Sequence, residues 1–207
     1  MKKLFANGIT GIACLLLSFS GFSQLSIEGQ TCVLSGTEYL YNLRGNIPDG
    51  AQVCVNGGTI TGVTSSCTSA LGGGSIRVTW TDKKGTISLK SGQGNASLDV
   101  VVTMPLDPGT ISSVKAELIS FKASCSAISC GKPTGGGCSA TYSFQWQRSL
   151  NNLNWEDIKG ATGQNLGALS ALTDTYFYRR RVTENNSQTV AYSDVTVVYV
   201  SVDMTGH

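Results

Sequence analysis

The sequence predicts an all-β protein in which two β-sandwiches stand in tandem behind a secretory signal peptide. Three observations lead to this prediction. Beyond residue 23, apolar and polar residues alternate with a period of two over most of the chain, which is typical of strands with one face on a core. Pairs of glycine, asparagine or proline separate these segments, and the first residues have the layout of a leader. Because 41% of the 207 residues are hydrophobic, the chain can bury substantial cores.

The leader is expected to occupy residues 1–23. Two lysines precede an apolar run over residues 4–22, which ends with the small residues Gly21 and Ser23. This layout predicts cleavage after Ser23. The unbroken apolar centre is shorter than the ~20 residues that cross a bilayer, and Cys14 lies inside it, so a membrane or lipid anchor is disfavoured. We therefore expect a secreted or cell-surface protein with no membrane insertion after signal cleavage.

Charge and histidine content argue against several classes of function. The chain has 15 Lys and Arg and 13 Asp and Glu, so removal of Lys2 and Lys3 with the leader leaves a formally neutral protein. A neutral protein lacks the long-range field that attracts nucleic acid or an anionic membrane. The single histidine is the last residue, His207, so a mechanism that needs a positioned imidazole has nothing to use. We expect a protein that is not an enzyme, takes no cofactor and binds no nucleic acid.

Six cysteines follow the leader, three in each half of the chain: Cys32, Cys54, Cys67, Cys125, Cys130 and Cys138. An even number in an exported chain predicts disulfides. Three per half means that either a bridge joins the halves or two thiols stay free. Within the second half, Cys125 with Cys138 is favoured as a staple across the Gly-rich segment 131–137. A zinc site is disfavoured because no short paired spacing such as C-x-x-C is present, and we expect no metal.

Strands are expected wherever the alternation is clear, as over residues 76–80, 98–104 and 142–146. Turn signals such as Pro48-Asp49-Gly50 separate these strands. A single helical turn near residues 155–158 is the exception to this pattern.

The domain boundary is predicted at two clustered prolines. Residues 105–109 contain both, directly after a strand, and they should block strand continuation and form a short, stiff hinge. The predicted domains are residues 24–104 and 110–202, followed by a tail over 203–207. Each domain is near the ~100 residues of an immunoglobulin-like sandwich.

The first half carries motifs of a known family: Ile27-Glu28-Gly29, Gly57-Gly58-Thr59-Ile60, Ile76-Arg77-Val78-Thr79-Trp80 and Gly85-Thr86-Ile87-Ser88-Leu89. They resemble the PKD-like domain that occurs in tandem in bacterial secreted and surface proteins. That family usually has a tryptophan where Cys54 stands. This departure, set beside the resemblance, suggests that Cys54 pairs with Cys32.

The second half carries a further set of motifs: Pro108-Gly109-Thr110-Ile111, Phe144-Gln145-Trp146-Gln147, Asn154-Trp155-Glu156-Asp157-Ile158 and Tyr178-Arg179-Arg180. They resemble the Ig-like modules that precede Rhs-type repeats or form arrays on bacterial surface proteins. The resemblance implies fold and compartment. It carries no catalytic residue, and it implies that such modules usually belong to much longer proteins.

The tryptophans are assigned mainly to cores. Trp146 alternates with Tyr142 and Phe144, so these three side chains are predicted to face the core, as is Trp80 at the end of its strand. Trp155 follows the Asn151-Asn152 turn and is expected to pack at the edge of the sandwich. It is also retained as a candidate ligand contact, because an exposed indole stacks on sugar rings.

Three successive arginines cannot form one basic surface on a strand, because neighbouring side chains point to opposite faces. Arg180 is expected to point inward and to need an acidic partner such as Glu156 or Asp157. Arg179 and Arg181 are then expected on the outer face, where they are candidate ligand contacts.

These observations favour an exported, non-enzymatic structural or adhesive interaction module at the cell surface, standing alone or as the N-terminal part of a larger surface protein. Its partner would be a protein or a glycan. The alternative is a carbohydrate-binding module, which needs two or three aromatic side chains on one face. The aromatic residues available for that role are Trp155, Phe177, Tyr192 and Tyr199.

Overall fold

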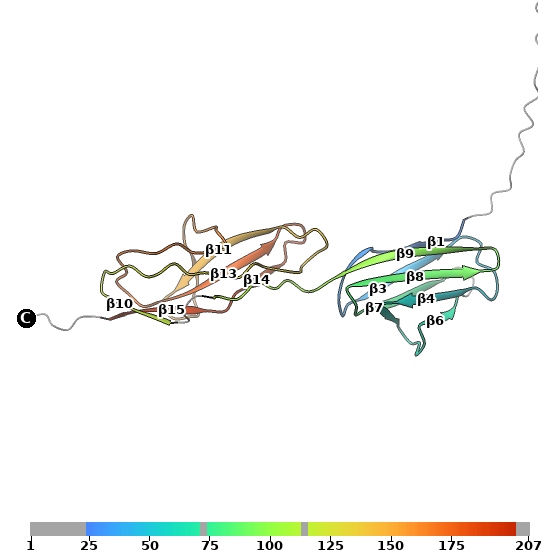
Figure 1. Cartoon of the computed structure of the whole chain (residues 1–207), viewed down its shortest axis with the longest axis horizontal. Helices are drawn as coiled ribbons and strands as arrows, with labels where there is room; N and C mark the ends of the chain where they lie inside the picture. The colour runs from blue at the N-terminus through green and yellow to red at the C-terminus, as the bar shows by residue number, and fades with distance from the viewer. Residues whose placement is uncertain (1–23, 71–73, 113–115, 202–207) are drawn as a thin grey trace, which may run out of the picture.

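The computed structural model describes residues 24–70, 74–112 and 116–201, and these residues form 15 strands and no helix. The strands build two β-sandwiches that lie end to end along the long axis of the molecule (Figure 1). The all-β, immunoglobulin-like fold predicted from the sequence is thus confirmed. The predicted leader and tail lie outside the described residues, so cleavage after Ser23 stays a prediction. Nothing in the described ranges is a helix long and apolar enough to span a membrane.

The first sandwich consists of two facing sheets. One contains, in order, β1 (Ser26–Glu28), β3 (Glu38–Arg44), β7 (Ser75–Trp80) and β5 (Gly58–Ile60). The other contains β2 (Cys32–Leu34), β9 (Gly94–Thr103), β8 (Lys84–Ser91), β4 (Gln52–Asn56) and β6 (Cys67–Ser69). All pairings are antiparallel except that of β2 with β9.

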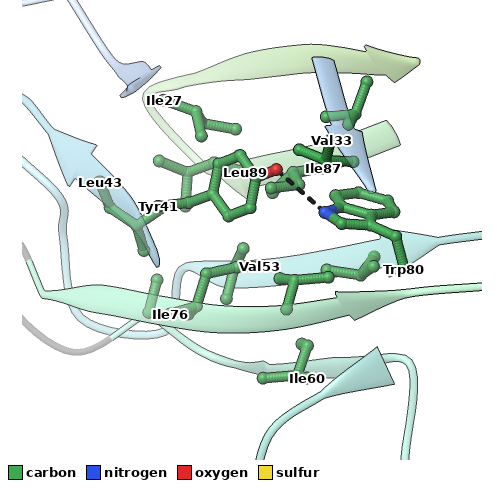
Figure 2. Packing of buried hydrophobic residues seen from close by; sticks show 14 of the residues in the cluster. Ile27, Val33, Tyr41, Leu43, Val53, Ile60, Ile76, Trp80, Ile87 and Leu89 are labelled. Atoms are coloured by element: carbon green, nitrogen blue, oxygen red, sulfur yellow. Dashed lines mark hydrogen bonds between the residues drawn. The ribbon is translucent and has the colours of Figure 1, made fainter. Parts of the chain in front are cut away.

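Trp80 and Tyr41 lie at the centre of the first core, and both are 0% exposed. The indole Nε1 donates to the Tyr41 hydroxyl at 2.9 Å (Figure 2). That hydroxyl in turn donates to the carbonyl of Gln30 at 2.9 Å. A side chain at Gly85 would fall on the six-membered ring of Trp80, so glycine is required there. The indole N–H of Trp80 and the hydroxyl of Tyr41 are therefore both satisfied inside this core.

The second sandwich has a single six-stranded sheet. Its order is β10 (Ala116–Ser120), β15 (Thr196–Ser201), β13 (Tyr176–Glu184), β11 (Tyr142–Ser149) and β12 (Glu156–Asp157), with β14 (Val190–Tyr192) also pairing with β13. The expected helical turn near residues 155–158 is wrong, because Glu156 and Asp157 pair with β11 as a short edge strand.

Irregular segments, in place of a second sheet, cover the inner face of the six-stranded sheet. They are joined by isolated bridges, among them Ile111 with Cys130 and Ile128 with Leu166. Apolar side chains from these segments pack on Trp146, which is 0% exposed and donates its indole N–H to the carbonyl of Gly163 at 3.1 Å.

Tyr142 and Phe144, predicted as core residues with Trp146, are only half-buried. They lie on the part of β11 where the covering layer is a loop. The hydroxyl of Tyr142 donates to the carbonyl of Gly135 at 2.7 Å, and the ring of Phe144 lies 4.7 Å from Cζ of Arg180. Their inward face therefore meets backbone and a guanidinium as well as apolar side chains.

The cysteine count predicted either a disulfide between the two halves or two free thiols, and the structure has both. A disulfide joins Cys32 of the first sandwich to Cys138 of the second, and Cys125 and Cys130 are free and buried. A second disulfide, between Cys54 and Cys67, links the paired strands β4 and β6.

The two pairings favoured from the sequence are wrong. Cys32 on β2 and Cys54 on β4 are three strand positions apart in one sheet, about 14 Å at ~4.8 Å per strand, which a disulfide cannot span. Cys125 is buried in the second core, whereas Cys138 is exposed and lies beside Val101 of β9.

The predicted hinge is docked against the second sandwich. Asp107 and Thr134 exchange two backbone hydrogen bonds, at 2.8 and 3.0 Å, and the amide of Gly136 donates to the carbonyl of Met104 at 2.9 Å. Gly135 has φ +75° and lies against the backbone of Pro105, so a side chain there would collide with the linker. Two covalent connections, the linker and the Cys32–Cys138 disulfide, therefore join the sandwiches.

Candidate ligand-binding face of the second sandwich

Strand β13 alternates its arginines between the two faces of the sheet, as the sequence predicts. Arg180 is 0% exposed, and Arg179 and Arg181 lie on the outer face, with partners there from β11, β12 and β14. The outer pair forms the core of an exposed cluster, and Arg180 has a different role inside.

Arg179 is held between two aromatic rings. Its Cζ lies 4.2 Å from the ring centre of Trp155 and 4.0 Å from that of Tyr192. Trp155 directly precedes β12, which lies beyond β11 on one side of β13, and Tyr192 ends β14, which pairs with the other side of β13. The two rings therefore reach Arg179 from opposite sides of this strand. Nε of Arg179 donates to Oε1 of Gln147, on β11, at 2.9 Å. The two ring contacts and this hydrogen bond hold the guanidinium in place.

The acidic side chains beside this cluster already have arginine partners. Oδ2 of Asp157 lies 3.1 Å from Nη2 of Arg181, and Oε1 of Glu156 lies 2.6 Å from Nε of Arg148. Among the described residues, no carboxylate pairs with Arg179. Burial lowers the pKa of Arg179, and the nearby positive charge of Arg181 contributes in the same direction. The charge of Arg179 is therefore partly desolvated and lacks a counterion.

A shallow hollow of about 310 Å³ adjoins Trp155 at the turn between β11 and β12. It is lined by Ser149, Leu150, Asn151, Asn154, Trp155 and Glu156. The size is near the lower end of the ~300–1,000 Å³ range of small-molecule sites. Trp155 thus has one ring face on Arg179 and also borders an open depression.

On the inner face, Arg180 has no acidic partner, so the expected pairing with Glu156 or Asp157 is wrong. Its Nη1 donates to the carbonyl of Gln164 at 2.6 Å, and its Nη2 donates to the carbonyls of Pro108 and Gly131 at 2.5 and 2.6 Å. Asp157 lies on the outer face beside Arg181, and Glu156, on the opposite face at the edge of the sheet, is paired with Arg148. Arg180 instead joins the linker and two covering loops to the sheet, and burial lowers its pKa.

Glu184, at the end of β13, is a second buried charge, which sequence reasoning missed. It is 1% exposed and accepts backbone N–H bonds from Ser187 at 2.7 Å and Asn186 at 3.1 Å. These hydrogen bonds, with the Ser187 amide first, lower the pKa of Glu184 to about 2. The Asn185-Asn186 turn signal was readable from the sequence, but it did not show that a carboxylate closes the turn.

The free thiols are poorly suited to chemistry. Burial raises the pKa of both Cys125 and Cys130, which lowers the fraction of reactive thiolate. The Cys130 thiol donates to the carbonyl of Gly109 at 3.7 Å. Across the described ranges, no three His, Cys, Asp or Glu side chains are grouped so that they could hold a metal ion.

The structure brings together part of the predicted site. Trp155, Arg179 and Arg181 lie in one cluster, and Tyr192, considered in the sequence only as an available aromatic, completes it. Phe177 is half-buried, and Tyr199 is 46% exposed beside β10, so neither stacks on Arg179. Gln147 was missed. Its outward position follows from alternation with Trp146, but its contact with Arg179 depends on the register of β11 against β13.

Comparison with known proteins shows a matching family model for residues 107–202, that of a domain of unknown function (DUF8696). No curated protein matches the chain. The match is confined to the second sandwich and the end of the linker.

Several solved structures that are similar to the chain are fragments with three or four domains in a row. The titin I-band fragment I67–I69 is 11% identical, with 86% of this chain and 65% of that chain covered and a TM-score of 0.47. Drosophila OTK extracellular domains 3–5 are 12% identical, with 86% and 62% covered and a TM-score of 0.47. The four N-terminal Ig domains of Dscam1 isoform 6.9 are 16% identical, with 82% and 42% covered and a TM-score of 0.41. The chain therefore spans less than half of that Dscam1 structure, and the similarity concerns fold alone.

Proposed function

We propose that this chain is an exported, non-enzymatic interaction module of the cell surface, acting as a rigid spacer that presents an adhesive face. In this proposal residues 1–23 are removed after Ser23, the first sandwich is PKD-like, and the mature protein is bacterial. It works alone or as the N-terminal part of a longer surface protein of the kind that carries Rhs-type repeats.

The observation that carries the proposal is the double connection between the sandwiches. A spacer must hold its two ends at a fixed separation, and a single flexible linker does not do this. Here the linker is hydrogen-bonded to the second sandwich through Asp107 and Met104, and the Cys32–Cys138 disulfide adds a second tether. Relative motion of the two sandwiches is restricted as a result.

The disulfides also support export. Disulfides form and persist in oxidising compartments and are rare in the reducing cytosol. Both Cys32 and Cys138 are exposed, so a reducing environment would have access to the bridge that joins the sandwiches. Two sandwiches held together by the Cys32–Cys138 disulfide keep this connection only in a compartment where the disulfide stays oxidised.

A second candidate function, carbohydrate binding, is supported by one specific observation. Trp155 is half-buried and Tyr192 is 45% exposed, and both lie on one face around Arg179. Aromatic side chains that share a face beside a fixed polar group are the usual elements of a glycan site. With such a site, the adhesive face would bind glycans.

The proposal is tested by expressing the full chain, with a C-terminal tag, in the cells that naturally produce it. We expect the protein in the surface or medium fraction, with Gln24 as its first residue. Beads coated with the purified protein should adhere to those cells or to their extracellular matrix. The matched control is the double variant Cys32→Ser, Cys138→Ser, which keeps both cores and loses the second tether. Retention in the cytosol, or beads that adhere no better than albumin-coated beads, would overturn the proposal.

A further inference from the structure

The outer cluster carries an excess of positive charge, and the excess resides on Arg179. On this face the cluster contains Arg179, Arg181 and one acid, Asp157 of β12. Asp157 is paired with Arg181, and Glu156, on the other face of β12, is paired with Arg148. Arg179 is left without an opposite charge, although its environment disfavours an uncompensated cation.

The terminal nitrogens of Arg179 are available to a ligand. Nε is occupied by Gln147, but Nη1 and Nη2 donate to no polar atom of the described residues. In the part of the chain that the structure describes, the buried side-chain polar atoms without a partner are Tyr178 Oη and Arg180 Nε. The two Nη atoms of Arg179 therefore reach the solvent.

This arrangement fits a planar oxyanion approaching end-on. A guanidinium presents two parallel N–H bonds to a carboxylate, and these charge-assisted bonds are among the stronger ones in proteins. Because Trp155 and Tyr192 already hold the guanidinium plane, little side-chain entropy is lost when a ligand binds. A carboxylate matches both the geometry and the missing charge.

The surroundings of Arg179 favour a sugar over a peptide as the carrier of that carboxylate. The Trp155 ring borders the hollow at the β11–β12 turn, and its indole N–H donates to none of the described residues. The sheet edges beside the cluster are β12 and β14, whose two and three residues are too few to guide an added peptide strand. A pyranose ring needs no strand edge. It packs its C–H face on an aromatic ring and uses its hydroxyls as hydrogen-bond partners.

We propose that the cluster formed by Trp155, Arg179 and Tyr192 binds the carboxylate of an acidic sugar residue, with Arg179 as the bidentate partner and the sugar ring seated at Trp155. The inference rests on the proposed function, because it names the ligand class of the adhesive face. It commits the ligand to glycans that contain hexuronic acid.

Titration calorimetry of the disulfide-bonded chain tests this inference. The probes are trisaccharides of galacturonate, glucuronate and mannuronate, together with the neutral trisaccharides of galactose, glucose and mannose. At least one uronate should bind ten-fold or more tightly than its neutral counterpart, because the neutral sugar cannot form the charge-assisted hydrogen bonds to Arg179. Raising the salt concentration from 50 to 500 mM should weaken that binding.

Variants separate the role of Arg179 from a general charge effect. Arg179→Met keeps an unbranched side chain between the rings and should lose at least ten-fold in uronate affinity. Arg179→Lys keeps the positive charge but cannot form the bidentate hydrogen bonds, so it should give an intermediate loss of uronate affinity. Lys159→Met, an exposed change of equal charge just after β12, should leave binding unchanged. Circular dichroism confirms that each variant is folded.

Several outcomes would overturn the inference. These are no uronate binding at millimolar concentration, equal binding of neutral sugars, or full affinity in Arg179→Met. Tighter binding of a hexaglutamate peptide than of any uronate, lost in Arg179→Met, would assign the site to acidic proteins instead. Bead adhesion distinguishes failure of this inference from failure of the proposed function. If beads coated with the Arg179→Met variant still adhere, the protein is adhesive through another surface, and only the uronate-binding inference fails.

Discussion

The two sandwiches have cores of different chemistry. In the first, the buried cluster consists of apolar and aromatic side chains, and the indole of Trp80 is satisfied by Tyr41. In the second, the core contains polar and charged groups as well. The buried polar residues of the described chain all belong to the second sandwich, Arg180 inside it and Gln147 on its outer face: Gln147, Ser149, Arg180, Glu184, Ser193 and Thr196.

The difference follows from how each sandwich satisfies its backbone. Two facing sheets pair most backbone groups within their own ladders, so side chains in the first core are free to be apolar. The second sandwich has one sheet and an irregular covering layer, whose carbonyls need other partners. Arg180 supplies them for Pro108, Gly131 and Gln164, so a charged side chain takes the place of missing strand pairing.

The largest effect is expected from Arg180→Met. Loss of the guanidinium leaves three buried carbonyls without their donor, and breaking a buried charged network costs about 3–5 kcal/mol. Hydrogen exchange should show reduced protection in β11 and β13 and unchanged protection in β7 and β8. Lys159→Met should stay within about 0.5 kcal/mol of the parent. A loss below about 1 kcal/mol for Arg180→Met would mean that the covering layer does not need the arginine.

A smaller effect, confined to the first sandwich, is expected from Trp80→Phe. The variant loses the hydrogen bond to Tyr41 and leaves a cavity in a core that is otherwise closely packed, with an expected cost of about 2 kcal/mol. Urea denaturation, followed by exchange protection in β3 and β7, measures it. Tyr41→Phe should cost less, because it removes only the hydroxyl. Reduced protection in β13 would contradict the independence of the two cores.

Acid should destabilise the second sandwich before the first, through Glu184. Its pKa is about 2 in the folded protein and near ~4.3 in the unfolded chain, so folding favours the ionised form. This contribution is fully present above about pH 4.3, falls as the pH is lowered and is lost below about pH 2. Glu184→Gln should flatten the dependence over this range. An unchanged acid profile in that variant would assign the effect to other carboxylates.

The smallest effect concerns the free thiols Cys125 and Cys130. Labelling them should not change the stability of the protein, but it tests which cysteines are bonded. Because burial raises the pKa of Cys125 and Cys130, neither should react with iodoacetamide in the native protein at pH 8. Unfolding the chain that begins at Gln24, and so lacks Cys14, should expose two thiols without reductant, and reduction should expose four more from the pairs Cys32–Cys138 and Cys54–Cys67. Peptide mapping by mass spectrometry measures both. Native labelling of Cys125 would show that the covering layer opens.

Particular residues show how far sequence reasoning reached. The period of two placed Arg180 inward and Arg179 outward, since alternation depends only on strand geometry. It did not find the partners of Arg180, because these come from residues 16 to 72 positions away along the chain. The short strand β12 was read as a helical turn, since two residues carry too little pattern to define a strand.

By itself the sequence determined the all-β class, the alternation of faces and the odd number of cysteines in each half. Those properties follow from local geometry and counting. Only the tertiary structure decided which cysteines meet, which groups satisfy Arg180, and that Trp155 and Tyr192 enclose Arg179. Each of these depends on strand order and register, which long-range packing fixes and which no local pattern encodes.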